Sequence, residues 1–194
     1  GWSRAHPFRV NPRKWLSQPC DLRAFCCRRM DRLGEAFSLT PDYRHNSEPE
    51  GVRNLMDTGV QLGRRFRALK LWMVLRHFGA DGLRRRLAEH MRLAELFAGW
   101  VDASDRFERL APVPFSVVCF RACPADLIAD HAALDDLNAR LLDGINATGD
   151  VFLSHTRLDG RFVLRLAVGH IRTTERHVAR AWELLQEQLG QLRR

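Results

Sequence analysis

The hydrophobic pattern after Leu62 limits what this chain can fold into more than any other feature of its sequence. Apolar residues recur at helical spacing from Leu62 onward, and Gly79 ends this first predicted helix. A second predicted helix runs from about Asp81 to Val101, again with a continuous apolar stripe. Two amphipathic helices in succession need another layer on which to bury their apolar faces, so the rest of the chain must supply one.

The residues after Pro114 supply strand patterns for that layer. The predicted elements are a strand at 115–121, a helix at 130–147, two strands at 151–157 and 161–168, and a last helix capped by Thr173 or Thr174. Asp159-Gly160, between the two adjacent strands, is a strong hairpin signal. The order from Leu62 onward is α-α-β-α-β-β-α, which predicts a small α/β layer structure that buries its own core.

The first 60 residues show shorter and less regular patterns. Residues 20–27 are predicted to form a strand, with Phe25 to Cys27 at its apolar end. From about Leu33 to Val60, Gly, Pro and Asn recur without a sustained period, which predicts a long loop. Loops of that length inside compact proteins are usually functional or disordered. We therefore expect a division near residue 60, with 1–60 and 61–194 as separate parts.

The basic composition makes a polyanionic partner a possibility that must be weighed. The chain has 31 Lys and Arg against 23 Asp and Glu, a net charge of +8. Arg84, Arg85 and Arg86 resemble a phosphate-binding run, but they point in successive directions around a helix, so a solvated face is the preferred interpretation. No recognition helix or aromatic platform accompanies them. Nucleic acid is therefore not expected as a partner.

Membrane and metal binding are also not expected. The longest stretch without a charged residue, Leu110 to Phe120, contains two prolines and is shorter than the roughly 20 residues of a membrane-spanning helix. The 5 cysteines form no C-x-x-C pair, which indicates reduced thiols in a cytoplasmic protein. Cys119 and Cys123 have a spacing compatible with metal ligands, but small buried hydrophobic residues are the preferred interpretation.

Lysine is so scarce that chemistry requiring a primary amine has only Lys14 and Lys70 to use. Lys14 lies within Asn11-Pro-Arg-Lys-Trp-Leu16, where apolar neighbours are expected to remove its amine partly from water. Desolvation favours the neutral form of an amine, which can form a Schiff base with an aldehyde. Taken alone, a lysine beside a tryptophan is more often a surface residue whose stem covers apolar area.

The wider pattern of motifs gives Lys14 a more specific context. Asn11–Leu16 resembles the lysine motif of the pyridoxal-phosphate-dependent amino-acid decarboxylases of the aromatic-L-amino-acid decarboxylase group. Residues 62–72 are nearly the signature of that family, and residues 36–43 resemble its loop segment. Shorter motifs follow at the expected intervals: Arg106–Glu108, Val118–Arg121, Asn146–Gly149 and Arg172–Thr174. The resemblance covers practically everything from Asn11 to Leu185.

The resemblance implies a role for each matching residue. Lys14 falls on the Schiff-base lysine, and Asn11 on a residue that helps hold the cofactor phosphate. Gly63 falls on a backbone contact in the cofactor pocket, and Tyr43, the only tyrosine in the chain, on the tyrosine of a mobile catalytic loop. A phenol on a closing loop can protonate the carbanion that forms when CO2 leaves, and can exclude water. On the residues alone, Tyr43 is equally compatible with an exposed loop aromatic, and Gly63 with a helix-start glycine.

The family also implies a fold, a reaction and partners. The expected enzyme has fold type I, uses pyridoxal 5'-phosphate and decarboxylates a small L-amino acid, an aromatic one as first choice, to the amine and CO2. Residues 1–60 would be the end of its large cofactor-binding domain, with the Schiff-base lysine and the catalytic loop. Residues 61–194 would be its small C-terminal α/β domain. Full-length relatives are expected to be homodimers.

Two departures from the family pattern affect this reading. Arg13 stands where the family has histidine, and Ala5-His6-Pro7 stands where the family has Ala-Asp-Ser. In relatives of this kind, the residues that stack on the cofactor ring and pair with its nitrogen precede the lysine by long distances. We therefore expect this chain to be the C-terminal part of such an enzyme, with little activity by itself. The alternative is a catalytically inactive remnant, or an interaction domain, of the same family.

Overall fold

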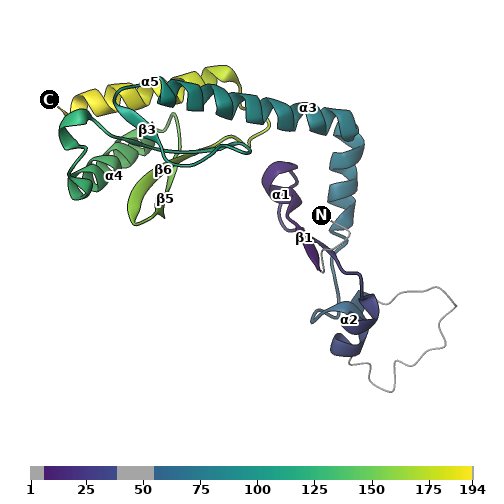
Figure 1. Ribbon diagram of the computed structural model, residues 1–194. Coiled ribbons are helices and arrows are strands. Elements are labelled where there is room, and N and C mark those ends of the chain that lie inside the picture. The colour runs from purple at the N-terminus through teal and green to yellow at the C-terminus, as the bar shows by residue number, and fades with distance from the viewer. Residues whose placement is uncertain (1–6, 39–54, 194) are drawn as a thin grey trace, which may run out of the picture. The chain divides into compact units, whose positions relative to one another are not determined.

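The computed structural model describes residues 7–38 and 55–193 (Figure 1). They belong to two compact units, Gly1–Gly79 and Ala80–Arg194. The boundary between them in the sequence falls within α3 (Ala68–Asp102). This helix leaves the helical conformation at Gly79, where φ is 63° and ψ is 174°. That left-handed φ favours glycine, so the predicted end of the first helix at Gly79 is confirmed. The division near residue 60 concerns the domains of a longer enzyme and stays a prediction.

The first unit is built from short elements. Its strands β1 (Phe8–Val10) and β2 (Ala24–Cys26) pair antiparallel, and the single-turn helix α1 (Pro12–Trp15) follows β1 directly. The predicted strand at 20–27 is thus present but shorter. The helix α2 (Met30–Phe37) and the 3-10 turn η3 (Leu55–Thr58) correct the prediction of a continuous loop. The apolar residues Met30, Leu33 and Phe37 of α2 do lie at helical spacing, but the stretch is only eight residues long and contains Gly34.

The first long helix begins at Ala68, six residues later than its hydrophobic pattern predicts. Arg65 and Arg67 explain the difference, because both side chains contact the carboxylate of Asp21. Residues two apart point in nearly opposite directions on a helix, so a helical start at Leu62 would separate these two guanidinium groups. The prediction that the apolar face of this first helix is buried is also wrong for the described residues. Phe66, Trp72 and Met73 are 75%, 57% and 54% exposed.

The second unit carries an antiparallel sheet of four strands in the order β3-β4-β6-β5. The strands are β3 (Phe107–Arg109), β4 (Val117–Ala122), β5 (Ser154–Leu158) and β6 (Arg161–Ala167). Its helices are the second part of α3, α4 (His131–Ala147) and α5 (Glu175–Leu192), with a 3-10 turn, η4, at Ala125–Leu127. The mixed α/β class is confirmed. The observed order adds β3, which has only three residues, two of them charged, and therefore shows no strand pattern.

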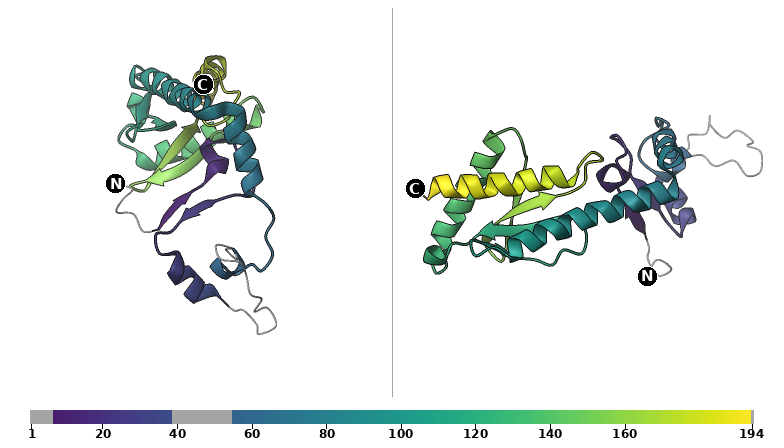
Figure 2. Two further views of the ribbon diagram at one scale, coloured as in Figure 1. Left: turned by 90° about the vertical axis from the view of Figure 1, so that its right-hand side faces the viewer. Right: turned by 90° about the horizontal axis from the view of Figure 1, so that it is seen from above.

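A single hydrophobic core joins the sheet of the second unit to its three helices. Three buried aromatic rings belong to this core, Phe97 from α3, Phe107 from β3 and Phe120 from β4, and the partly buried ring of Trp182 from α5 packs against it. The Phe97 ring meets Phe120 edge-on at 5.1 Å and Trp182 at 5.7 Å. These contacts hold α5 alongside the second part of α3 (Figure 2).

Two asparagines of α4 attach that helix to the backbone of neighbouring segments. Asn138 is fully buried; its Oδ1 accepts from the Ala122 amide at 2.7 Å, and its Nδ2 donates to the Ala122 carbonyl at 2.9 Å. Asn146 does the same for Leu153, accepting at 2.8 Å and donating at 3.0 Å. The pairing of β4 with β6 ends at Phe120. Two residues further on, at Ala122, the side chain of Asn138 takes the place of a paired strand. Asn146 belongs to the Asn146–Gly149 motif, so this motif helps to attach α4 to the segment before β5.

Local turn chemistry agrees with the predictions in this unit. Asp159 and Gly160 both have positive φ, 49° and 79°, as a two-residue type I′ hairpin requires. Asp130 caps α4 by accepting from the Ala133 amide at 2.9 Å. Thr174 is the N-cap of α5, and its backbone amide donates to Nδ1 of His177 at 3.1 Å. The side chains of Asp130 and His177 thus each accept a hydrogen bond from a backbone amide at the start of a helix, where the helix itself supplies no partner.

One buried histidine makes the stability of the second unit depend on pH. His90 of α3 is 2% exposed, and burial lowers its pKa below the ordinary value of 6.5. The nearby positive charge of Arg86 acts in the same direction, while a hydrogen bond with the His170 backbone and the charge of Glu89 oppose it. The unfolded chain therefore binds a proton more readily than the folded unit between the lowered pKa and about pH 6.5.

We expect the thermal midpoint of the second unit to fall as the pH is lowered from 7.5 to 5.5, because protonation of His90 favours the unfolded state. A H90Q variant should lose part of this pH dependence, whereas H131Q, which changes an exposed histidine of α4, should keep all of it. Thermal unfolding followed by circular dichroism at both pH values measures the difference. Parallel curves for the unmutated chain and H90Q would contradict the assignment.

Candidate active site

The segment around Lys14 is a tight turn between two paired strands. Pro12 occupies the first position of α1, where its fixed φ suits a helix start and its missing N–H is not needed. The turn is closed by hydrogen bonds from the Lys14 amide to the Asn11 carbonyl at 3.2 Å and from the Leu16 amide to the Pro12 carbonyl at 3.1 Å. Because β1 and β2 pair on either side of it, the turn has a defined place in the first unit.

Lys14 presents its amine to solvent. The side chain is exposed, although Trp15 and Leu16 next to it are half-buried, so the expected partial burial of Lys14 is incorrect for this chain. Among residues 7–38 and 55–193, no hydrogen bond or ion pair engages its amine. Lys70 differs: its Nζ donates to the Cys20 carbonyl at 2.8 Å and lies 3.7 Å from Oδ1 of Asp21. The Lys70 side chain is itself 42% exposed, so what distinguishes Lys14 is that its amine has no partner among the described residues.

Asp21 connects the Lys14 loop to the segment that carries the other strong motif. Its Oδ2 accepts from Nη2 of Arg65 at 2.8 Å and from Nε of Arg67 at 3.1 Å, and Lys70 adds a third positive charge. The hydrogen bond from Arg67 is the main cause of a lowered Asp21 pKa, and the charges of the three basic groups contribute. The structure thus brings Asp21, five residues after the Asn11–Leu16 motif, into contact with residues of the 62–72 motif.

Asn11 is placed to offer a polar group at the start of the turn. It is half-buried, and its Oδ1 is fully buried without a hydrogen-bond partner among the described residues. Gln18, at the end of the same loop, is 3% exposed and leaves both amide atoms unpaired in the described part of the chain. Buried polar atoms usually have a protein, water or ligand partner, because leaving them unpaired costs about 1–3 kcal/mol each.

The other two expected site residues are less defined. Gly63 is exposed, its φ lies outside the left-handed region, and a Cβ added there would meet nothing within 4 Å. Its backbone conformation therefore does not require glycine, and its expected cofactor contact stays a prediction. Tyr43 lies outside the described residues. Within those residues, no group of three or more His, Cys, Asp or Glu could hold a metal ion.

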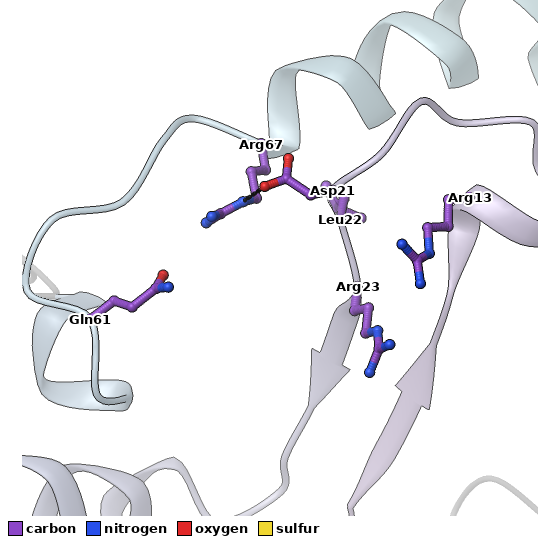
Figure 3. Close-up of a pocket in the computed structure, with 6 residues that line it drawn as sticks. All are labelled: Arg13, Asp21, Leu22, Arg23, Gln61 and Arg67. Atoms are coloured by element: carbon purple, nitrogen blue, oxygen red, sulfur yellow. Dashed lines mark hydrogen bonds and ion pairs between the residues drawn. The ribbon is translucent and has the colours of Figure 1, made fainter.

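A cavity of about 340 Å³ opens beside the Lys14 turn (Figure 3). It is lined by Arg13, Asp21, Leu22, Arg23, Gln61 and Arg67. Sequence reasoning noted Arg13 only as a departure from the family and did not select the others. Spacing offered no signal for them, because the contacts of Asp21 with Arg65, Arg67 and Lys70 span 44 to 49 positions of the chain.

The comparison with known families decides the ancestry of this site. Residues 1–123, which include Lys14, Asn11 and the whole cavity lining, match the model described as "Pyridoxal-dependent decarboxylase conserved domain". The chain belongs to the pyridoxal-dependent decarboxylase family. The matched residues extend past Gly79, so this family assignment includes all of the first unit and part of the second.

Relatives in this decarboxylase family share both sequence and structure with the chain. Tryptophan decarboxylase 2 of Oryza sativa subsp. japonica is 41% identical over 97% of this chain, and phenylacetaldehyde synthase of a Rosa hybrid cultivar is 37% identical over 96%. The crystal structure of Oryza sativa TDC with PLP and tryptamine has a TM-score of 0.92 and 36% identity, covering 99% of this chain and 40% of that one. The chain spans 38% of the length of both curated relatives.

The residues present fit two groups of pyridoxal phosphate, its aldehyde and its phosphate. Lys14 offers the exposed primary amine that an aldehyde requires, and the side-chain amide of Asn11 can donate to a phosphate through its Nδ2, whereas its Oδ1, which has no partner among the described residues, can only accept. The guanidinium groups of Arg13 and Arg23 give the neighbouring cavity a positive character suited to a phosphate.

Among the described residues, no helix has both the length and the apolar composition that a membrane-spanning segment needs.

Proposed function

We propose that this chain is the C-terminal part of a pyridoxal-phosphate-dependent enzyme that decarboxylates an aromatic L-amino acid to its amine and CO2. The observation that supports this proposal most is the exposed amine of Lys14 between β1 and β2, which has no partner among the described residues. The chain that carries it belongs to the pyridoxal-dependent decarboxylase family. The names of the similar proteins support an aromatic substrate, since they include tryptophan and tyrosine decarboxylases. A neighbouring structure was solved in complex with L-tryptophan.

Each proposed site residue has a task that its chemistry permits. Lys14 attaches the cofactor through its amine, Asn11 helps hold the cofactor phosphate, and Gly63 contributes a backbone contact. When bound, pyridoxal phosphate supplies an electron sink for the charge left behind as CO2 departs. Tyr43 donates the proton that completes the product amine, because a phenol is a suitable acid on a loop that closes over substrate.

The organisation of the complete enzyme is part of the same proposal. Residues 1–60 form the end of a fold type I large domain, and residues 61–194 form the small C-terminal domain. The exposed apolar face of α3, which includes Trp72 and Met73, supports a larger assembly, because apolar surface of this kind is normally covered by another part of a protein. We further propose a cytoplasmic homodimer. The chain spans 38% of the length of the relatives it matches, and we propose that the groups that stack on the cofactor ring and pair with its nitrogen belong to the part that it does not match.

The competing proposal is a catalytically inactive remnant, or an interaction domain, of the same family. It is favoured by Arg13 in place of the family histidine and by the unpaired buried amide of Gln18 in the lysine loop. Both proposals place the chain in the same family. They differ only in whether the turn that carries Lys14 still supports catalysis.

A chimera separates the two proposals. The portion of the rice tryptophan decarboxylase 2 that this chain does not match is joined to residues 1–194, and release of CO2 and tryptamine from L-tryptophan is measured. We expect turnover by the chimera and turnover at background by the 194 residues alone, because electron withdrawal by the cofactor needs groups outside this chain. Phenylacetaldehyde from L-phenylalanine is assayed in parallel, since aldehyde synthases are among the relatives.

Two outcomes of the chimera assay would contradict the proposal. A folded chimera that retains the cofactor but releases no CO2 from any aromatic amino acid would favour the inactive remnant. Robust decarboxylation by the 194 residues alone would show that the absent groups are dispensable.

A further inference from the structure

The cavity beside the Lys14 turn holds more positive charge than its own acidic group can balance. Arg13, Arg23 and Arg67 line it together with a single carboxylate, Asp21. They come from three places in the first unit: α1, the residue before β2, and the residue before α3. At about 340 Å³, the cavity is several times larger than the roughly 30 Å³ that one water molecule occupies in the liquid. There is thus room for a small polyatomic ligand.

The charge of Asp21 is already compensated by groups other than Arg13 and Arg23. Arg65 and Arg67 donate to its Oδ2 at 2.8 Å and 3.1 Å, and Lys70 lies 3.7 Å from its Oδ1. This clustering lowers the pKa of Asp21, mainly through the hydrogen bond from Arg67, so the carboxylate stays ionised and remains bound to its three basic partners. It has little negative potential left to offer to the rest of the cavity.

Arg13 and Arg23 therefore remain uncompensated within the described chain. Arg13 makes a weak contact from its Nη1 to Sγ of Cys20 at 3.7 Å, which carries no negative charge in a thiol. Among the described residues, no carboxylate contacts Arg23. Figure 3 shows both guanidinium groups on the same side of the segment that leads into β2, with Arg67 bound to Asp21 on the other side. Like charges that share a cavity repel each other, and an anion between them removes that repulsion.

We propose that Arg13 and Arg23 bind the oxyanion of a phosphoryl group in this cavity. Each guanidinium presents a planar fork of N–H donors, which matches two oxygens of a phosphate at once. Gln61 lines the same cavity, but Figure 3 shows it on the other side of the segment that leads into β2, away from Arg13 and Arg23. Because Arg65, Arg67 and Lys70 compensate the charge of Asp21, this carboxylate opposes anion binding only weakly.

The position of Arg13 in the chain leaves two sources for the phosphoryl group. Arg13 immediately precedes Lys14, so the cavity can take the phosphate of the cofactor that Lys14 is proposed to attach. It can equally take free phosphate, which needs no reaction at Lys14. Oxyanion binding therefore does not depend on the proposed decarboxylase activity, and the two proposals can fail separately.

Binding of inorganic phosphate to the full chain, followed by calorimetry, tests the site. We expect saturable binding whose Kd rises roughly tenfold in R13Q and in R23Q, because each loses one charge-assisted pair of hydrogen bonds. The matched control is R85Q, which removes the same charge from an exposed position of the second unit and should change the Kd less than about twofold. R23K keeps the charge but loses the planar fork, so it should fall between R23Q and the unmutated chain.

A labelling experiment at Lys14 distinguishes the two sources. The chain is treated with pyridoxal phosphate or with pyridoxal, then with borohydride, in the presence and absence of inorganic phosphate. If the cavity takes the cofactor phosphate, inorganic phosphate slows labelling by pyridoxal phosphate but not by pyridoxal. If it takes only free phosphate, neither reaction slows. An equal loss of affinity in R13Q, R23Q and R85Q, or uptake that never saturates, would overturn the proposed site.

Discussion

Replacing Lys14 with alanine is expected to reduce amine release by the chimera with the rice enzyme by roughly a thousandfold or more. Removing a group that forms a covalent bond in the reaction typically costs at least that much. Lys70 cannot take its place, because its amine is held by the Cys20 carbonyl and by Asp21. The measurement is the rate of CO2 release under saturating aromatic amino acid.

Two further variants separate covalent attachment from charge. K14R keeps a positive charge but has no amine for an aldehyde, so it should be as inactive as K14A. K70A removes the other lysine and one partner of Asp21, and it should retain activity within about tenfold. Equal losses in K14A and K70A would mean that both lysines act through the stability of the first unit.

The N138L substitution is expected to destabilise the second unit by about 3 kcal/mol. Leucine has the same number of side-chain heavy atoms and a similar branched shape, but it removes both hydrogen bonds to Ala122 and leaves that buried amide and carbonyl without their partner. Each unpaired buried backbone group costs about 1–3 kcal/mol. Urea unfolding of the full chain, followed by circular dichroism, measures the change in the free energy of unfolding.

An exposed position of the same helix provides the control for N138L. R140Q changes a solvent-exposed side chain of α4 and should alter the unfolding free energy by less than about 0.5 kcal/mol. A loss below about 1 kcal/mol for N138L would show that Ala122 finds another partner when Asn138 is removed.

The second unit was the more predictable part of the chain. Its helices are long enough to display a period, and Asp159-Gly160 specifies its turn type from backbone conformation alone. The strand β3 escaped prediction because three residues cannot show alternation. Asn138 escaped because the hydrogen bonds of a buried amide depend on which backbone comes near it, and that is decided by packing rather than by local pattern.

The first unit was predictable mainly through family resemblance. Lys14 was selected because the residues around it match a motif, and the physical reason first given for its reactivity, partial burial, does not hold in this chain. The start of α3 was misplaced because the ion pairs of Asp21 with Arg65 and Arg67 outweigh the helical propensity of residues 62–67. Such contacts between distant positions leave no periodic signal in the sequence.

The most direct test of the central claim is to find which lysine pyridoxal phosphate modifies. The unmutated 194-residue chain is incubated with the cofactor, reduced with borohydride, digested and analysed by mass spectrometry of the two lysine-containing peptides. We predict that Lys14 carries most of the label, because its amine is exposed and has no partner among the described residues, whereas that of Lys70 is engaged. Equal labelling of both lysines, or labelling of Lys70 alone, would contradict Lys14 as the attachment residue.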